Sequence, residues 1–199
     1  MDATVELTAG TGDLLAEDLE SGFVELVRRH ATPVRTFLLR VSGSAAVADD
    51  LGQDTFLKAY TALRGYSAER RRALRPRSWL LAIAANTWRN HVRTATRHPV
   101  APFPAEESCT TWPDGDPGPE ERAANALDRG VLTAALLQLP EQQRTAVVLR
   151  HVIGMSYQEA AEVVGCPVGT VKAQVSRGLA RLRGIVPPDT AQAQEVTRP

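Results

Sequence analysis

A proline-rich segment near the middle of the sequence most constrains how this chain can fold. Residues 98–119 read HPVAPFPAEESCTTWPDGDPGP and contain six of the 13 prolines in the 199-residue chain. Proline lacks a backbone N–H and fixes φ, so a segment this rich in it stays extended and joins no helix or sheet. We therefore expect a linker over residues 98–122, with a folded domain on each side and no internal repeat.

The hydrophobic pattern on both sides of the linker is helical. Apolar residues recur three and four positions apart over residues 23–97 and 123–183, without strand-like alternation. Within the first segment we expect helices at about 45–63 and 78–96, and we expect Pro33 to kink or divide the helix before them. The predicted fold class is all-α, with two small helical domains.

A formal net charge of zero conceals segments of opposite sign. Residues 1–22 hold six acids and no base, residues 23–98 hold 14 Lys or Arg against five acids, and residues 99–122 hold one Arg against six acids. The basic block suggests a polyanionic partner, although a solvated Arg-rich surface explains the same count. We expect the acidic segment 1–22 to be a flexible extension, with Ser21 as the first helix cap, and the tail 184–199 to be disordered.

Several functional classes are disfavoured by composition. The sequence has no run of 18 apolar residues and no basic, apolar start, so we expect neither a membrane span nor a secretory signal, and a cytoplasmic location. Cys109 and Cys166 are isolated and suit neither a disulfide framework nor a zinc site. No nucleophile–base pair, phosphate loop or metal cluster is evident. We therefore expect no catalytic residue, metal, cofactor or small-molecule substrate.

Residues 156–182 carry a helix-turn-helix pattern. Ser156 and Glu159 have the spacing of a capping box, which starts a short helix. Gly165 suits a sharp left-handed turn, and Pro167 stands at or just before the start of a second helix. That second helix has an apolar stripe at Val171, Val175, Leu179 and Leu182. The spacing predicts two helices joined by a tight turn.

The opposite face of the second helix decides the predicted function. It carries short polar or cationic side chains, at Thr170, Lys172, Gln174, Ser176 and Arg177. Such a face fits a major groove, where Gln and Arg pair with base edges and Lys suits phosphates. A solvated amphipathic helix is the alternative, but the complete cap, turn and stripe favour DNA binding.

A second motif lies in the N-terminal domain, where residues 48–60 read ADDLGQDTFLKAY. Asp50, Gln53 and Asp54 stand at i, i+3 and i+4 and so share one helix face. Other positions of this helix can be buried, namely Leu51, Thr55, Ala59 and Leu63. An acidic and amide patch on a basic domain suits a basic protein surface better than DNA, with a solvated polar face as the alternative.

These motifs together resemble a known family. The stretch ADDLGQDTFLKAY resembles region 2 of the extracytoplasmic-function sigma factors, and LPEQQR at 139–144 with GTVK at 169–172 resembles their region 4. The resemblance implies a two-domain transcription initiation factor without catalytic activity. It also implies that Asp50, Gln53 and Asp54 bind the coiled coil of the polymerase β′ subunit.

Further roles follow from the same resemblance. The helix at 78–96 would contact the minus-ten element through Asn86, Arg89, Asn90 and Arg93. The arginine-rich loop Arg64–Arg77 would capture an unstacked promoter base, and the second helix of the helix-turn-helix would read the minus-thirty-five element. Implied partners are core RNA polymerase, through β′ and β, promoter DNA, and an anti-sigma factor that can hold the protein at the membrane. The linker would thread the polymerase channel.

The sequence departs from the family at positions that bear on DNA recognition, namely Ala85, Asn90, Ala173 and Gln174. These departures indicate that the chain reads a promoter sequence of its own. The alternative function is a helix-turn-helix regulator that acts without polymerase, which explains residues 156–183 but leaves the acidic patch without a purpose. An enzyme such as a transposase needs clustered metal-binding carboxylates, which the sequence does not show.

Overall fold

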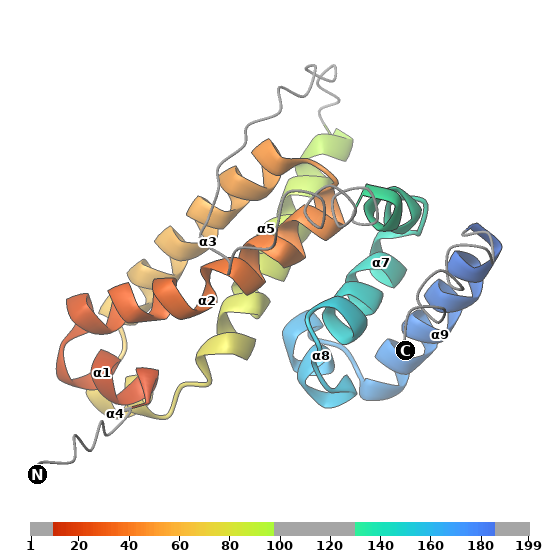
Figure 1. Cartoon of the computed structure of the whole chain (residues 1–199). Coiled ribbons are helices and arrows are strands. Elements are labelled where there is room, and N and C mark those ends of the chain that lie inside the picture. The colour runs from red at the N-terminus through yellow and green to blue at the C-terminus, as the bar shows by residue number, and fades with distance from the viewer. Residues whose placement is uncertain (1–9, 98–129, 186–199) are drawn as a thin grey trace, which may run out of the picture.

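The computed structural model describes residues 10–97 and 130–185, and its regular elements there are all helical (Figure 1). The N-terminal half consists of α1 (Thr11–Glu17), α2 (Leu19–Ser42), α3 (Ala45–Arg64), α4 (Ala68–Arg72) and α5 (Pro76–Arg97). The C-terminal half consists of a helix through residues 130–137, α7 (Glu141–Val147), the π-helical η1 (Val148–Val152), α8 (Tyr157–Val164) and α9 (Val168–Ile185). The all-α class is confirmed. Three segments lie outside the described residues: residues 1–9, the predicted linker 98–122 and nearly all of the predicted tail 184–199.

The three long helices α2, α3 and α5 pack together to form the core of the N-terminal half. The Ser44 hydroxyl caps α3 by accepting from Val47 N at 3.4 Å. Fully buried side chains from the three helices fill the core, among them Leu26, Phe37, Leu38, Leu63, Leu80 and Leu81. Thr55 is also buried, but its hydroxyl donates to Leu51 O at 2.7 Å, so no hydrogen bond is lost. This core fixes the outward face of α3.

The N-terminal segment is folded from residue 10 onward, so the expectation of a flexible extension through residue 22 is wrong for residues 10–22. Helix α1 buries Leu15 completely, and a Cβ on Gly22 would stand 2.5 Å from Leu15 N, so only glycine permits this close approach. Asp18, rather than Ser21, caps α2 by accepting from Glu20 N and Ser21 N. Only a few apolar residues hold α1 in place, so the acidic stretch that contains it shows no clear helical pattern in the sequence.

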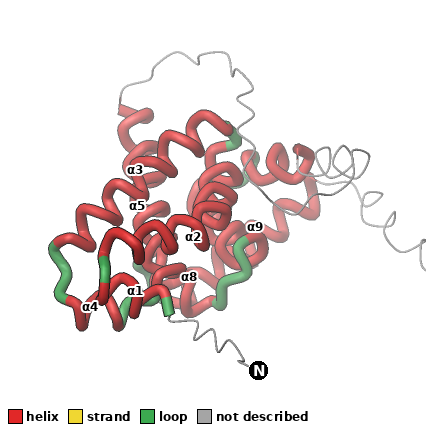
Figure 2. Tube along the Cα trace, turned by 60° about the vertical axis from the view of Figure 1, so that its left-hand side comes forward, coloured by secondary structure: helices red, strands yellow, loops and turns green. Residues whose placement is uncertain are grey.

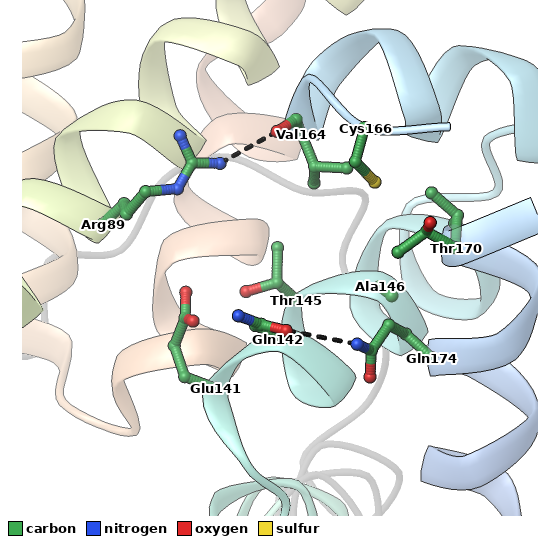
Figure 3. A pocket seen from close by; sticks show the side chains of 10 residues that line it. Arg89, Glu141, Gln142, Thr145, Ala146, Val164, Cys166, Thr170 and Gln174 are labelled. Carbon is green, nitrogen blue, oxygen red and sulfur yellow. Dashed lines mark hydrogen bonds between the residues drawn. The ribbon is translucent and has the colours of Figure 1, made fainter. Parts of the chain in front are cut away.

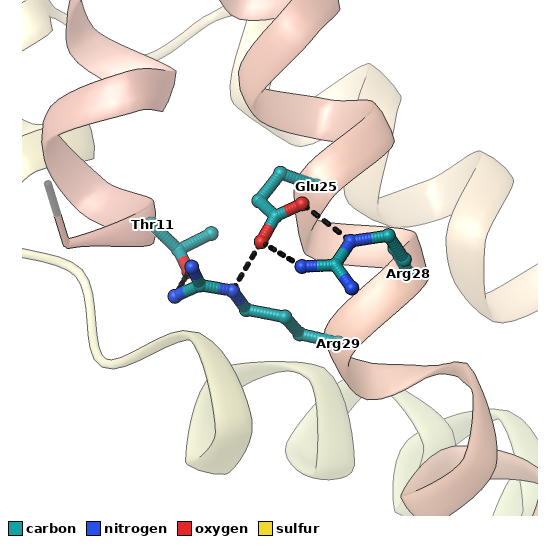
Figure 4. A network of polar contacts seen from close by, with 4 residues as sticks. All are labelled: Thr11, Glu25, Arg28 and Arg29. Carbon is teal, nitrogen blue, oxygen red and sulfur yellow. Dashed lines mark hydrogen bonds and ion pairs between the residues drawn. The ribbon is translucent and has the colours of Figure 1, made fainter. Parts of the chain in front are cut away.

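A polar network also holds α1 against α2 (Figure 4). The Glu25 carboxylate accepts from Arg28 and Arg29, and Arg29 Nη1 reaches Thr11 Oγ1 at 3.3 Å. Hydrogen bonding from Arg28, supported by Arg29, lowers the pKa of Glu25 to about 2. The side chain of Arg29 therefore connects a carboxylate on α2 to the first residue of α1.

The structure excludes part of each of two expectations about this half. Pro33 lies inside α2, which continues as one helix through it, so it does not divide the helix. The stretch 64–77 is not wholly a loop, because it contains α4. Arg71 in α4 donates to Leu63 O at 3.0 Å, and Arg72 pairs with Asp13 at 3.2 Å. These two arginines attach α4 to its neighbours instead of standing free for a melted strand.

The helix-turn-helix forms as the sequence predicts. Ser156 and Glu159 make a complete capping box, with Glu159 N donating to Ser156 Oγ at 3.1 Å and Ser156 N donating to Glu159 Oε2 at 2.8 Å. Gly165 ends α8 in the left-handed conformation, with φ of 71°. Pro167 lies just before α9, and its carbonyl accepts from Val171 N at 3.2 Å. Helix α9 is therefore anchored at a fixed turn.

The two halves pack against one another, as the turned view in Figure 2 also shows. Helix α5 contacts α8, and α2 contacts both α7 and η1. Buried side chains of both halves, such as Val41 and Leu136, belong to one continuous core. The proline-rich linker predicts two domains but does not predict this contact between them.

Candidate nucleic-acid interface

The outward face of α9 carries the residues predicted to read DNA. Val171 and Val175 are buried against the rest of the C-terminal half, as the apolar stripe predicts. The predicted readers follow the opposite side: Thr170, Lys172, Ser176 and Arg177 are exposed, and Gln174 is half-buried. A helix anchored by one face presents the other as a rigid surface, which direct base readout requires.

Gln174 has a partner that the sequence does not indicate. Its Nε2 donates to Gln142 Oε1 at 3.2 Å, which joins α9 to α7 (Figure 3). The bond uses one of the two amide hydrogens, so the carbonyl oxygen and the second hydrogen stay available for a base edge. Gln142 belongs to the LPEQQR motif, but motif position alone gave no sign of this contact. The bond fixes how the Gln174 amide is turned.

Lys172 lies over an aromatic ring that it shares with a second cation. Its Nζ stands 5.8 Å from the ring centroid of Tyr157, and the Arg150 guanidinium stands 5.1 Å from the same centroid. These distances fall within the range of cation–π attraction. Two positive charges gathered at the start of α8 form a surface that suits the phosphate backbone of DNA.

The four predicted minus-ten residues lie exposed along α5. They form two pairs at i and i+3: Arg89 Nη1 donates to Asn86 Oδ1 at 2.6 Å, and Arg93 Nη2 donates to Asn90 Oδ1 at 3.0 Å. Each amide thus accepts from an arginine, and these bonds leave its own N–H donors available. The pairing places alternating guanidinium and amide groups along one edge of the helix, which suits both phosphates and base edges. Trp88 between them is buried, so it belongs to the core.

A cavity of about 450 Å³ brings the two predicted DNA surfaces together (Figure 3). Arg89 of α5 lines one side of it, and Thr170 and Gln174 of α9 line another. Arg89 also donates through Nη2 to Val164 O, the last residue of α8, at 3.1 Å. Residues predicted for the minus-ten and minus-thirty-five elements therefore face one small space, which sequence reasoning does not reveal.

The acidic face of α3 is open to solvent. Asp50, Gln53 and Asp54 are all exposed, and Asp54 lies 3.7 Å from Lys58. Within the part of the chain that the structure describes, no hydrogen bond or ion pair engages the side chain of Asp50. The structure brings these three residues to one face, as their spacing predicts.

An apolar groove of about 270 Å³ adjoins this acidic face. Val27, Ala31 and Val34 line it from α2, and Phe56 and Gly52 line it from α3. At its edge Arg35 pairs with Asp49 at 2.7 Å. Two further apolar side chains, Val24 and Leu57, are 67% and 65% exposed. Apolar area beside charged groups is typical of a protein-binding surface.

Neither a metal centre nor a membrane helix is found where the structure can be described. Over residues 10–97 and 130–185, no group of three or more His, Cys, Asp or Glu is placed to hold a metal ion. Across the same ranges, no helix is both long and apolar enough to cross a membrane.

Comparison with protein families assigns both halves. The family described as Sigma-70 region 2 matches residues 26–98, and the family described as Sigma-70, region 4, matches residues 129–182. The first match covers the helices that carry the acidic face and the Asn–Arg pairs. The second covers the helix-turn-helix.

Named relatives agree with this assignment. The chain is 36% identical over 142 residues to "ECF RNA polymerase sigma factor SigC" of Mycobacterium tuberculosis, covering 71% of each protein. It is 33% identical over 175 residues to "RNA polymerase sigma-H factor" of Pseudomonas aeruginosa, covering 83% of each. It is also 34% identical over 159 residues to "ECF RNA polymerase sigma factor SigE" of Mycolicibacterium smegmatis, where the match covers 80% of this chain and 59% of that longer protein.

Two solved structures share the fold. The structure of CnrH in complex with the cytosolic domain of CnrY has a TM-score of 0.62 at 25% identity, covering 87% of this chain and 93% of that one. The sigma factor RpoE of Bartonella quintana, in complex with the anti-sigma factor NepR, has a TM-score of 0.61 at 26% identity, covering 85% and 96%. Sequence motifs, fold and relatives agree, and this chain belongs to the ECF RNA polymerase sigma factors.

Proposed function

We propose that this chain directs core RNA polymerase to a defined set of promoters in response to a signal, and that the polymerase performs all the catalysis. One observation carries the proposal: a solvent-exposed acidic face on α3 and a helix-turn-helix with an exposed polar face on α9 occur in the same chain. A DNA-binding protein that works alone has no use for the first face. Because its partners are polymerase and chromosomal DNA, we expect the protein to act in the cytoplasm.

The polymerase docks on the α3 face in this proposal. Asp50, Gln53 and Asp54 contact a basic surface of the β′ coiled coil, and the neighbouring groove accepts apolar side chains. Charged groups in such an interface steer the encounter and fix its register, while the apolar area contributes most of the affinity. The exposed Val24 and Leu57 extend the same surface.

Helix α9 reads the minus-thirty-five element as duplex. Gln174, its amide turned by Gln142, pairs with a base edge, and Arg177 lies one turn further along the same face. Lys172 binds a phosphate, which positions the helix without specifying sequence. Thr170 and Ser176 supply further hydroxyl contacts.

Helix α5 contacts the minus-ten element during melting. Asn86, Arg89, Asn90 and Arg93 supply the contacts, two amides and two guanidinium groups along an exposed edge. The linker 98–122 threads the polymerase channel, where its acidic residues mimic nucleic-acid charge.

We also infer that an anti-sigma factor binds this chain. The RpoE structure that shares its fold holds an anti-sigma factor, and the CnrH structure holds the cytosolic domain of CnrY. A membrane-bound partner of this kind would hold the sigma factor at the membrane until a signal releases it.

The alternative is a helix-turn-helix regulator that binds an operator without polymerase. Co-purification of the tagged full chain with purified core polymerase separates the two. We expect a stoichiometric complex that survives size-exclusion chromatography. If the folded chain shows no affinity for core polymerase, the proposed function is wrong and the regulator remains.

A further inference from the structure

Helix α1 contacts both α2 and the short helix α4, so it connects two segments that are far apart in the sequence (Figures 1 and 2). The side chain of Leu15 is fully buried, and Thr11 and Gly12 are buried as well. A helix of seven residues is too short to be stable alone in water. Packing against its two neighbours therefore holds α1 in place.

The contact between α1 and α4 is a close approach of two backbones. A Cβ added to Gly12 would stand 2.7 Å from Arg72 O and 3.2 Å from Arg71 O. The obstructing atoms are backbone carbonyl oxygens, which cannot rotate away as the end of a side chain can. Glycine therefore lets α1 approach the end of α4 more closely than any other residue would allow.

Polar contacts strengthen the same junction. Arg71 of α4 donates through Nε to Leu63 O, in the last turn of α3, at 3.0 Å. It also donates through Nη1 to Leu15 O, in the last turn of α1, at 3.4 Å. Carbonyls in the last turn lie at the negative end of the helix dipole, so a guanidinium suits both. The ion pair between Arg72 and Asp13, at 3.2 Å, adds another contact between α4 and α1.

Other side chains of the segment 64–77 suit single-stranded DNA. Arg64, Arg70 and Arg75 are exposed. The guanidinium of Arg70 lies 3.8 Å from the centroid of the Tyr66 ring, and the Tyr66 and Trp79 rings lie 6.1 Å apart. An aromatic ring stacked with a guanidinium, among exposed cations, is the combination by which proteins bind an unstacked base and the backbone beside it.

The groups that would bind this base depend on α1 for their position. Arg70 belongs to α4, a helix of five residues that cannot keep its shape alone. Selection of one base over another requires that the contacting groups be held within about 0.5 Å of the required place. The contacts of Gly12 and Asp13 with α4 supply this rigidity.

We propose that α1 is a positioning element, which fixes α4 so that Tyr66 and Arg70 meet the melted promoter strand in one arrangement and select a base there. The inference rests on the proposed function, since it takes the segment 64–77 as a contact to melted DNA. Gly12 and Asp13 act through α4 and need not touch the DNA.

Hydrogen exchange of the free full chain tests the junction without DNA or polymerase. Gly12→Ala favours the helical state of α1 but overpacks its contact with Arg72 O, so backbone exchange over residues 66–74 should become about tenfold faster. Gly130→Ala is the control, because a Cβ there meets nothing within 4 Å. Exchange inside α3 and α5 should stay unchanged in both variants. Equal exchange over residues 66–74 in Gly12→Ala and the wild type would overturn the positioning role.

Selection from a pool of random single-stranded oligonucleotides tests what the junction does. The pool is bound to the complex of the full chain with core polymerase, and the bound fraction is sequenced against that of core polymerase alone. We expect the wild-type chain to enrich one base at a fixed position, and we expect Gly12→Ala to lower this enrichment severalfold. A purely structural α1 would lower the amount of folded chain but not the choice of base by the folded molecules.

Two outcomes of the selection overturn the proposal. One is an enrichment that is the same in Gly12→Ala and the wild type, and the other is a wild-type complex that enriches no base. If no complex with core polymerase forms, the proposed function fails. The exchange measurement still decides in that case whether α1 holds α4.

Asp13→Ala sharpens the selection, because charge and positioning predict opposite results. Loss of an acid beside a DNA-binding segment strengthens binding to every sequence, whereas loss of the ion pair loosens α4 and lowers base enrichment. Both partners of the pair are about half exposed, so the loss should be small, about twofold. Glu17→Ala removes an exposed acid from the same helix and should keep the full enrichment. Equal enrichment by the two variants would overturn the role of Asp13.

Discussion

The outward faces of α3, α5 and α9 are all polar, but their side chains differ in whether they already have partners within the chain. On α3, Asp50 and Gln53 extend into solvent beside an apolar groove. On α5 and α9, Arg89 and Gln174 already hydrogen-bond to other helices of the same chain. The first face is ready for a partner, whereas Arg89 and Gln174 line one cavity and each already has a hydrogen-bond partner within the chain.

This difference indicates an order of events. A surface that is free in the isolated chain can be bound first, and surfaces turned toward each other can be bound only after a rearrangement. On the proposed function, we therefore expect polymerase docking through α3 to precede promoter reading through α9.

The largest effect is expected on the free face. The double variant Asp50→Ala with Gln53→Ala should lose about 2 kcal/mol or more of polymerase affinity, roughly thirtyfold, because central interface side chains contribute most of the binding energy. Titration of a labelled full chain with core polymerase measures this. Glu17→Ala, an exposed acid on α1, serves as control and should bind normally. Equal affinity of the double variant and the control would remove α3 from the interface.

A somewhat smaller effect is expected for base reading by α9. In the complex with core polymerase, Gln174→Ala should cost about 1–3 kcal/mol on the preferred promoter and less on one with a scrambled minus-thirty-five element. Fluorescence anisotropy with both duplexes measures the difference. A surface residue that reads nothing stays within about 0.5 kcal/mol on both. That outcome would mean that Gln174 makes no base contact.

Lys172 should behave differently from Gln174, although both lie on α9. Because we assign it to a phosphate, Lys172→Ala should weaken all sequences about equally and lower the slope of log K against log salt by roughly one. The same duplexes are titrated at several salt concentrations. A loss confined to the preferred promoter would instead assign Lys172 to a base.

The smallest effect concerns His30, which is half-buried near Arg77. Burial lowers the pKa of His30 from its ordinary 6.5, and the charges of Arg77 and Arg29 lower it further. Below about pH 6.5 the unfolded chain therefore binds a proton before the folded chain does, and folding stability falls as the pH falls through this window.

Titration of the His30 imidazole by NMR checks the prediction for this residue. The pKa should lie below 6.5 in the wild type and rise in Arg77→Ala, while Arg28→Ala should leave it nearly unchanged. A pKa at or above 6.5 in the wild type contradicts the environment that the structure gives to His30.

The sequence predicts those parts of the molecule that depend on local signals. The capping box at Ser156, the turn at Gly165 and the shared face of Asp50 and Gln53 all follow from spacing within one or two helical turns. The structure contains each of them where it was expected.

Features that depend on distant backbone groups could not be predicted. A carbonyl at a helix end has no signature of its own, so nothing in the sequence indicates that Arg89 would bind Val164 O. Helix α1 was missed for a related reason: Leu15 is buried because Gly22 allows a close approach, which periodicity does not report. The contact between the halves is therefore a finding of the structure.

Reconstituted transcription tests the central claim most directly. Purified core polymerase is mixed with the full chain and with fragments of the genome that encodes it, and the transcript ends are sequenced. We predict a small set of discrete start sites that appear only with the chain and share sequence at minus ten and minus thirty-five. They should be lost with Asp50→Ala and Gln53→Ala. Transcript ends identical to those of core polymerase alone, with a folded chain present, would contradict the assignment of this protein as a promoter-specificity subunit.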